Sequence, residues 1–387
     1  MGLVIVPVFS GLDLEHFVSL PWSIYRKCPQ WVPPLRSQDR ALLSPGLHPF
    51  WQHAERRLFL AKRDGRICGR ICALIDHAYN RYAHERCGAF GFFECEDDQE
   101  ACLGLLQAAS AWLAARGMQF MRGPVSPSTN YTCGLLVDGF EVRPALMMPW
   151  NLPYYPRLLE GFRLHKEQDL FAYRIERAHL TISPLVAEEL ARSKNTSRFT
   201  FRAADKANLA RDIKIMLDLY RRSWAKNWYF SPLTPEEEDF LVHELLAIVD
   251  IRYFVLFFHQ GKPAGGMVAL PDLSPLLQKL NGRLSLTAPI SYLQTRTECA
   301  RGLRIMLFGI LEEYRLFGLP YLLLGYMLDE AQKSPELKWV EGSWVLEDNT
   351  AICDLIEDFS GTICSRYRIY RKELEVCAPS SFSYPCS

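Results

Sequence analysis

The stretch LRIMLFGILEEYRLFGLP, residues 303–320, decides how we interpret the chain. It begins with an apolar run, Leu303 to Leu311, that has the length and composition of a buried strand. The turn-like segment Glu312 to Pro320 follows it, a helix-like segment continues to about Lys333, and Trp339 to Leu346 is a second strand-like run. A strand, a tight loop, a helix and a parallel strand place backbone N–H groups at a helix N-terminus, which is a ready site for phosphate.

The helix prediction rests on the spacing of apolar residues. Pro320 suits the first helical turn, where its missing N–H costs nothing. Gly318 allows the backbone to approach a ligand closely, and Arg315 adds a fixed charge with bidentate reach. The residues at i, i+3, i+4 and i+7 that give the helix one apolar face are Leu324, Met327, Leu328 and Ala331.

Composition and charge indicate a globular protein without a nucleic-acid partner. The chain has 387 residues, of which 49% are hydrophobic and 23% charged, and this length favours two domains. Lysine plus arginine and aspartate plus glutamate both total 44, so no basic surface excess is expected.

The twelve cysteines are scattered, with no C-x-x-C pair and no His/Cys cluster of zinc spacing. We therefore expect no metal, and reduced core cysteines in a cytoplasmic protein. The N-terminus lacks a basic segment, which argues against a signal peptide, and no apolar run is long enough to span a membrane.

The order of elements repeats along the chain. Strand, helix, helix, hairpin, strand, helix and strand follow one another in residues 1–175 and again in residues 199–387, with a linker at 176–198 that has room for a helix. One hairpin is marked by Asp64-Gly65 at its turn. The predicted fold class is therefore α/β with mixed sheets, in two tandem domains of one topology.

Two irregular loops precede the linker, at residues 123–130 and 149–156. Both are rich in turn-forming residues, and we expect neither to contain a regular element. Such loops often line sites, and the alternative, which composition favours, is a proline-rigid connection with aromatic plugs into the core.

The two repeats differ in charge at the loop where phosphate would bind. After the strand ending at Glu94, the first repeat continues with three acidic residues, Glu96 to Asp98, which would repel a pyrophosphate. The second repeat offers Arg315 and Gly318 instead. Charge alone assigns the phosphate site to the second repeat.

Arg315-Leu-Phe-Gly318-Leu-Pro320 resembles the Q/R-x-x-G-x-G/A signature of GNAT acyltransferases, which binds the pyrophosphate of coenzyme A. Pro320 stands where Gly or Ala is usual, so the cradle would have one donor fewer. A loop capping an ordinary helix is the alternative. The resemblance implies a coenzyme A site made by the loop amides and by nearby strand and helix-start residues: Leu307, Phe308, Gly309, Tyr314, Arg315, Leu316, Phe317, Gly318, Leu319 and Asn349.

Over both halves the chain is similar to the bacterial ceramide synthase family, tandem GNAT proteins that join an acyl-CoA to a sphingoid base. Three departures concern the substrate range and the affinity for CoA: Tyr131-Thr132 replace an acidic pair, Trp150 replaces Tyr, and Pro320 replaces a small residue. The stretches that carry the similarity are residues 91–98, 123–130, 133–140, 147–156, 227–228, 280–284 and 343–349.

This resemblance implies N-acylation, which requires a group that takes a proton from the amine. A free alkyl ammonium has a pKa near 10.4, so a carboxylate must accept that proton directly or through water. Glu347 follows the strand beside the phosphate loop and is the first candidate, and Glu94 is the second. Either could instead be a helix-flanking charge. Tyr370 or Tyr367 could protonate the leaving thiolate, although a core tyrosine is the simpler interpretation.

The acceptor would need an apolar wall and a polar site for its head. Burial of one methylene is worth about 0.8 kcal/mol, so a long chain favours an enclosed site between two domains. The wall candidates are Trp150, Tyr154, Tyr155 and Trp228, and the head-group candidates are Asn130, Asn151 and Asn281.

The expected partners are a long-chain acyl-CoA, a sphingoid base (sphinganine or 3-ketosphinganine) and, through the lipid substrate, peripheral contact with the inner membrane. Two other functions remain open: a tandem GNAT transferase using aminoacyl-tRNA, which zero net charge disfavours, and a non-catalytic lipid- or CoA-binding protein.

Overall fold

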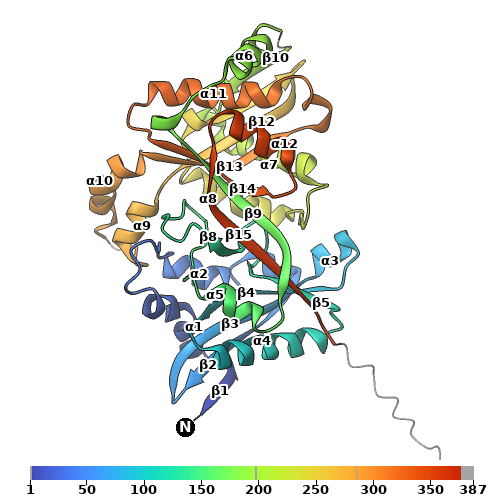
Figure 1. The fold of residues 1–387 in the computed structure, drawn as a ribbon, viewed down its shortest axis with the longest axis vertical. Coiled ribbons are helices and arrows are strands. Elements are labelled where there is room, and N and C mark those ends of the chain that lie inside the picture. Colours follow the sequence, from blue (N-terminus) through green and yellow to red (C-terminus); the bar gives the residue numbers. More distant parts are fainter. Residues whose placement is uncertain (1, 197, 285, 376–387) are drawn as a thin grey trace, which may run out of the picture.

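The computed structural model describes residues 2–196, 198–284 and 286–375. One mixed sheet runs through the whole molecule, with helices on its faces (Figure 1). The first repeat consists of β1 (Leu3–Pro7), α1 (Gly11–Ile24), α2 (Arg36–Leu42), η1 (Pro49–Gln52), β2 (Ala54–Arg63), β3 (Arg66–Asp76), α3 (His77–Ala83), β4 (Cys87–Cys95), α4 (Gln99–Ala114), β5 (Phe120–Gly123), β6 (Val125–Ser126), β7 (Thr132–Cys133), β8 (Leu135–Asp138), α5 (Tyr155–Glu160) and β9 (His165–Glu176).

The linker contains η2 (Arg177–His179) and α6 (Pro184–Thr196), and the same order of elements then begins again. The second repeat consists of β10 (Phe199–Ala203), η3 (Lys206–Asn208), α7 (Leu209–Trp224), α8 (Pro235–Leu246), η4 (Ile251–Tyr253), β11 (Phe254–His259), β12 (Lys262–Pro271), α9 (Ser274–Leu280), α10 (Ala288–Cys299), β13 (Gly302–Ile310), η5 (Glu312–Tyr314), α11 (Leu319–Lys333), β14 (Trp339–Leu346), α12 (Thr350–Asp358) and β15 (Thr362–Glu373). The predicted α/β class and the predicted repeat of elements are confirmed.

Each of the two long strands β9 and β15 pairs with strands of the other repeat. The strand order is β1-β2-β3-β4-β5-β15-β9-β14-β13-β12-β11-β10, with β8 paired to β15. Strand β15, the last strand of the described residues, therefore pairs with β5 of the first repeat, whereas β9 pairs with β14 of the second. Both strands run side by side through the centre of Figure 1, where the two halves of the sheet join.

Local sequence explains where the elements turn. Asp64 and Gly65 both have positive φ and form the predicted hairpin turn between β2 and β3. Gln260 and Gly261 do the same between β11 and β12. Gly318, also with positive φ, precedes α11, and Pro320 lies in its first turn as predicted.

The structure also corrects parts of the sequence interpretation. The irregular loops are not free of regular structure, because β6 lies in the first loop and α5 begins at Tyr155 in the second. Antiparallel pairing with β7, which sequence spacing does not reveal, makes β6 a strand. The sequence interpretation also missed α3, α9 and α10.

Three further structural facts concern the described part of the chain. Its cysteines form no disulfide, and most of them are buried. It contains no cluster of residues arranged to hold a metal ion. Among the described helices, none has the length and apolar character needed to cross a bilayer.

Candidate functional site

Strands β13 and β14 separate at their C-terminal ends. They pair in parallel from Gly302 with Trp339 to Ile305 with Gly342, and no pairing is recorded beyond this point among the described residues. Leu307, Phe308 and Gly309 lie on β13 past the separation. One edge of this stretch pairs with β12, so the other edge faces the gap. Trp224 of α7 donates a hydrogen bond from Nε1 to the Phe308 carbonyl (3.0 Å).

Helix α11 begins beside this gap, and no side chain caps its N-terminus. In contrast, Asp98 caps α4 in the first repeat by accepting from the Ala101 amide (3.1 Å), and its carboxylate also pairs with Arg63. An anion is favoured at a helix N-terminus that carries no side-chain anion of its own. The equivalent helix start in the first repeat, that of α4, already carries a carboxylate.

The gap in the first repeat is closed by backbone. Strands β4 and β5 pair only from Cys87 to Ala89, and β6 then fills the opening. A Cβ built on Gly91 would stand 1.6 Å from the Val125 carbonyl oxygen, so the two backbones touch. The Phe92 amide donates to Ser126 Oγ at 2.8 Å. Only the second repeat therefore keeps an open edge between its parallel strands.

The predicted phosphate loop leads into α11. Arg315 donates from its guanidinium to the carbonyls of Ser223 (2.8 Å) and Ile310 (3.3 Å). These bonds fix the loop to α7 and to the end of β13. Leu316 and Phe317 are exposed, and Leu319 is buried. Ser193 of α6 packs on Gly318, since a Cβ there would meet its Oγ at 2.3 Å. The linker helix thus flanks this loop.

A small cavity lies at the gap, between the two repeats, with a volume of about 40 Å³. This volume holds a few water molecules at most, so a larger ligand requires side chains or the repeats to move. The lining residues come from the first-repeat loops, from α7 and the segment after it, and from β9 and β14: Thr129, Cys133, Leu170, Tyr220, Trp224, Asn227, Trp228, Phe230, Trp344 and Leu346.

The first irregular loop packs against the second repeat. Asn130 accepts a hydrogen bond from the Tyr220 hydroxyl (2.8 Å) and donates from Nδ2 to the Ser231 carbonyl (2.9 Å). Thr129 donates from Oγ1 to the Tyr229 carbonyl (3.1 Å). Trp228 lines the cavity itself. Two of the predicted substrate residues, Asn130 and Trp228, therefore lie in or beside the cavity.

Glu347 follows β14 directly, one residue after Leu346 of the cavity wall. Its Oε2 lies 2.6 Å from Lys166 Nζ, and its Oε1 accepts from the Asp169 amide at 2.9 Å. The side chain is 28% exposed, so solvent reaches the carboxylate. The carboxylate is therefore held in position on one side and open to solvent on the other.

Glu94 ends β4 and lies in a different, more enclosed cluster. Its Oε2 accepts from the Tyr155 hydroxyl (2.6 Å) and from the Tyr25 hydroxyl, and Arg70 Nη2 lies 3.7 Å from Oε1. Burial raises the pKa of Glu94 above its ordinary value, against Arg70 and the two tyrosines, which favour the charged form. Tyr154 donates to the Cys95 carbonyl beside it.

The two glutamates belong to separate sites. Four inter-strand steps lie between β4 and β14, which at about 4.8 Å each amounts to a separation on the order of 20 Å. Trp150 lies with Glu94, because its ring is 5.7 Å from that of Tyr25. The structure thus groups Trp150, Tyr154 and Tyr155 around Glu94.

The remaining predicted residues make contacts of their own, and Tyr370 packs in the same buried cluster as Tyr25 and Tyr155. Tyr370 is buried on β15 and donates to Glu160 Oε1 (3.1 Å), far from the open edge of β13. Asn151 is buried against the backbone of Leu136. Asn281 ends α9 and accepts from Trp22 Nε1 (3.0 Å). Asn349 precedes α12, where its side chain makes no capping bond.

A buried charged cluster that sequence reasoning missed joins the repeats. His53 lies between Asp76 of its own repeat (Nδ1 to Oδ1, 3.1 Å) and Glu237 of α8 (Nε2 to Oε2, 3.0 Å). Tyr131 donates to the other oxygen of Glu237. Burial opposes protonation, yet the bonds and charges of both carboxylates outweigh it and raise the pKa of His53 to about 9. Thr234 and Glu237 form a capping box at the start of α8, a spacing that is visible in the sequence, but nothing local indicates the partner of Glu237.

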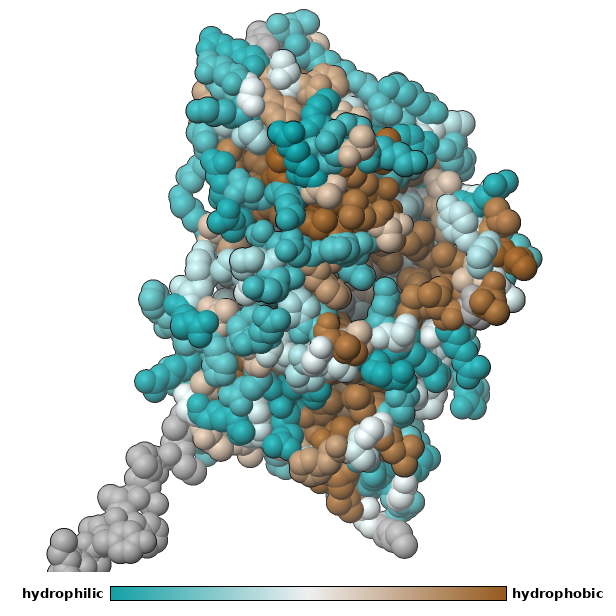
Figure 2. Space-filling model, turned by 180° about the vertical axis from the view of Figure 1, so that it is seen from behind, coloured by the Kyte–Doolittle hydropathy of each residue, from teal (hydrophilic) through white to brown (hydrophobic). Residues whose placement is uncertain are grey.

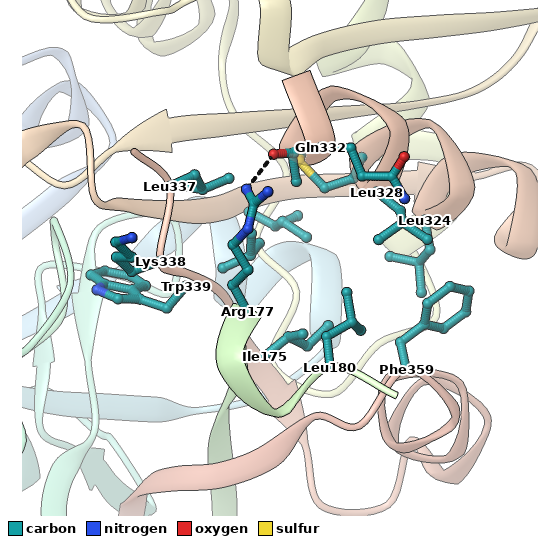
Figure 3. Close-up of a pocket in the computed structure, with 14 residues that line it drawn as sticks. Ile175, Arg177, Leu180, Leu324, Leu328, Gln332, Leu337, Lys338, Trp339 and Phe359 are labelled. Atoms are coloured by element: carbon teal, nitrogen blue, oxygen red, sulfur yellow. Dashed lines mark hydrogen bonds between the residues drawn. The ribbon is translucent and has the colours of Figure 1, made fainter. Parts of the chain in front are cut away.

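A larger apolar pocket, of about 250 Å³, lies between α11 and the start of β14 (Figure 3). None of the predicted site residues lines it. Arg177 projects across the pocket and donates to the Ala331 carbonyl (2.7 Å). This bond satisfies a backbone carbonyl in the last turn of α11. Its apolar walls and the structural role of Arg177 distinguish this pocket from the gap between β13 and β14.

The comparisons with known proteins agree with this architecture. No family model matches the chain. It is 30% identical to "Protein YghO" of Escherichia coli over 94% of this chain and 93% of that one. It is 31% identical to "Bacterial ceramide synthase" of Caulobacter vibrioides over 96% of this chain and 98% of that one.

The chain belongs to the bacterial ceramide synthase family. Membership of the bacterial ceramide synthase family confirms the resemblance noted in the sequence and identifies an acyl-transferring enzyme. Among solved structures, a tandem GNAT protein from the clavulanic acid biosynthesis pathway is similar with a TM-score of 0.54 and 11% identity, covering 98% of this chain and all of that one. This likeness shows that the present chain, a member of the ceramide synthase family, has the tandem GNAT fold.

Proposed function

We propose that the protein transfers a long fatty acyl group from acyl-CoA to the amine of a sphingoid base, sphinganine or 3-ketosphinganine, to give ceramide or ketoceramide. The observation that carries the proposal is the full-length similarity to a bacterial ceramide synthase. The open edge of β13 beside an uncapped helix supports it, since this combination suits a thioester and its pyrophosphate.

Coenzyme A would bind the second repeat, with its pyrophosphate on the amides from Tyr314 to Leu319. The contrast between the repeats supports this side. The first repeat has a carboxylate at the equivalent helix start and backbone across its gap, whereas α11 has neither. An amide of β13 between Leu307 and Gly309 would stabilise the oxyanion.

Glu347 would accept the amine proton through a water molecule. Its place one residue beyond the cavity wall supports this role, and so does its partial exposure. Attack of the neutral amine on the thioester carbonyl forms the amide bond, breaks the carbon–sulfur bond and releases CoA thiolate. Trp228 and Asn130 would lie against the acceptor.

One observation keeps Glu94 as the second candidate for the base. Its pKa is raised by burial, and a carboxylate whose pKa approaches the working pH is a better general base. Its distance from β14 counts against it if the thioester lies in the second repeat.

The test is turnover by the purified protein of a sphingoid base with long-chain acyl-CoA, with the amide detected by mass spectrometry. We expect product only when both substrates are present. Glu347→Gln should abolish turnover while acyl-CoA affinity stays within about twofold. Absence of amide product from the unmodified protein with every sphingoid base would refute the function. Loss of turnover in Glu94→Gln but not in Glu347→Gln would exchange the two roles.

The lipid acceptor also implies peripheral contact with a membrane, because sphingoid bases reside in bilayers. The enzyme would be located in the cytoplasm and would contact the membrane peripherally.

A further inference from the structure

The segment from α9 to α10 carries an unusual concentration of exposed apolar side chains. Leu286 is fully exposed and Leu284 is 70% exposed. Helix α10 projects from the edge of the molecule in Figure 1, and the corresponding edge in Figure 2 shows apolar side chains gathered on the surface. We call the following residues the α10 surface: Leu284, Leu286, Ile290, Tyr292 and Leu293.

The polarity of helix α10 is opposite to that of an ordinary surface helix in a water-soluble protein. The side chains that it buries are small or polar, Ser291, Thr295 and Cys299, and they fall at i, i+4 and i+8 on one face. Ile290 and Leu293 project outward instead. An amphipathic helix in water normally turns its apolar face inward, so this outward face requires an apolar environment of its own.

The charges around the α10 surface are cationic. Residues 274–299 contain Lys279, Arg283 and Arg296, all exposed, and a single acidic residue, Glu298. Glu298 is paired with Arg143 of the first repeat (3.0 Å). A chain with no net charge thus presents a locally positive rim around an apolar surface, which is the combination that favours anionic lipid headgroups.

The segment just before the α10 surface, residues 278–282, is bonded to the first repeat. Gln278 of α9 donates to the Pro29 carbonyl (2.7 Å), and the Arg36 amide donates to the Gly282 carbonyl (3.1 Å). Trp22 donates to Asn281. Ring contacts then run from Trp22 to Trp31 (5.3 Å) and from Trp31 to Tyr25 (5.1 Å), whose hydroxyl binds Glu94. The surface therefore adjoins a line of aromatic rings that leads into the first repeat.

We propose that the α10 surface docks on an anionic lipid bilayer, with its apolar side chains at the headgroup boundary and Lys279, Arg283 and Arg296 among the headgroups. The choice of a bilayer as occupant rests on the proposed function, in which the acceptor is a membrane lipid. Docking there places the aromatic line of the first repeat against the membrane.

The test is flotation of the purified full chain with phosphatidylcholine vesicles, with and without phosphatidylglycerol. The unmodified protein floats with the anionic vesicles and loses this binding in high salt. Leu286→Glu and Leu293→Glu each reduce the partition by at least about tenfold. Leu185→Glu is the matched control, because Leu185 is 78% exposed on α6, and it leaves the partition unchanged.

Melting temperatures of the three variants exclude misfolding, and amide synthesis in detergent micelles reports on the proposed function independently. Flotation without turnover supports docking and refutes the function, whereas turnover without flotation does the reverse. Equal flotation of Leu286→Glu and the control overturns the docking proposal. A change of oligomeric state in Leu286→Glu, without any vesicle binding by the unmodified protein, also overturns it and assigns the surface to a second copy.

Discussion

His53 Nε2 of the first repeat and Glu237 Oε2 of the second lie 3.0 Å apart, and the same ring binds Asp76 through Nδ1. The ring thus ties two carboxylates from opposite sides of the junction. Because its pKa is about 9 when folded and 6.5 in the reference state, the folded form binds the proton more tightly. The stabilisation is complete below about pH 6.5 and is lost as the pH rises through about 9.

We therefore expect the free energy of unfolding to fall by about 3 kcal/mol between neutral pH and pH above 9, since each pKa unit corresponds to about 1.4 kcal/mol. Denaturant unfolding at a series of pH values measures this. His53→Gln should be less stable at neutral pH and should lose most of the slope. His165→Gln, at an exposed position, should keep the slope. An unchanged slope in His53→Gln would contradict the assignment.

Gly318→Ala should weaken acyl-CoA binding by more than about tenfold, because the phosphate loop requires positive φ at this position and a Cβ would strike Ser193. Gly261→Ala is the matched control, with φ of +77° and nothing within 4 Å of the added Cβ. Both variants should lose roughly 1 kcal/mol of stability through backbone strain. Titration with acyl-CoA separates them, and equal affinities would count against the second repeat as the CoA site.

Asp98→Asn tests the first repeat in the same assay. The change weakens the pairing with Arg63 and the cap on α4, so we expect a loss of roughly 1 kcal/mol of stability. Acyl-CoA affinity should stay the same, because the proposed pyrophosphate site is on α11. A change in affinity comparable with that of Gly318→Ala would move the nucleotide to the first repeat.

Glu94→Gln should lower stability by roughly 2 kcal/mol, because Arg70 would keep a buried charge without its carboxylate partner. If Glu347 is the base, the folded variant should retain turnover within a few-fold. Circular dichroism melting and single-turnover amide formation measure the two effects. Complete loss of chemistry at normal acyl-CoA affinity would make Glu94 the base.

Local patterns in the sequence predicted many of the elements but not their partners. The spacing from Leu324 to Ala331 indicated α11 correctly, and Asp64-Gly65 marked a hairpin that exists. Both signals lie within a few residues of the feature that they predict. The exchange of β9 and β15 depends on pairing between segments about two hundred residues apart, for which periodicity holds no information.

The candidate site shows the same limit. Glu347 was predicted as a candidate because it follows a strand next to a recognisable loop, and it stays a prediction. His53 was missed because its two carboxylates lie 23 and 184 residues away in the chain. Glu94 was the second candidate because it has the equivalent place in the first repeat, and the strand order shows that equivalent places are not neighbouring places.

The insertion of β15 between β5 and β9 has a consequence for the chain as it leaves the ribosome. Domains usually fold in the order in which they are synthesised, but β5 and β9 lack the strand that joins them until residues 362–373 have been made. During that interval each of them has an unpaired edge, the kind of edge that recruits other chains. The nascent chain therefore exposes these strand edges until β15 has been made and can cover them.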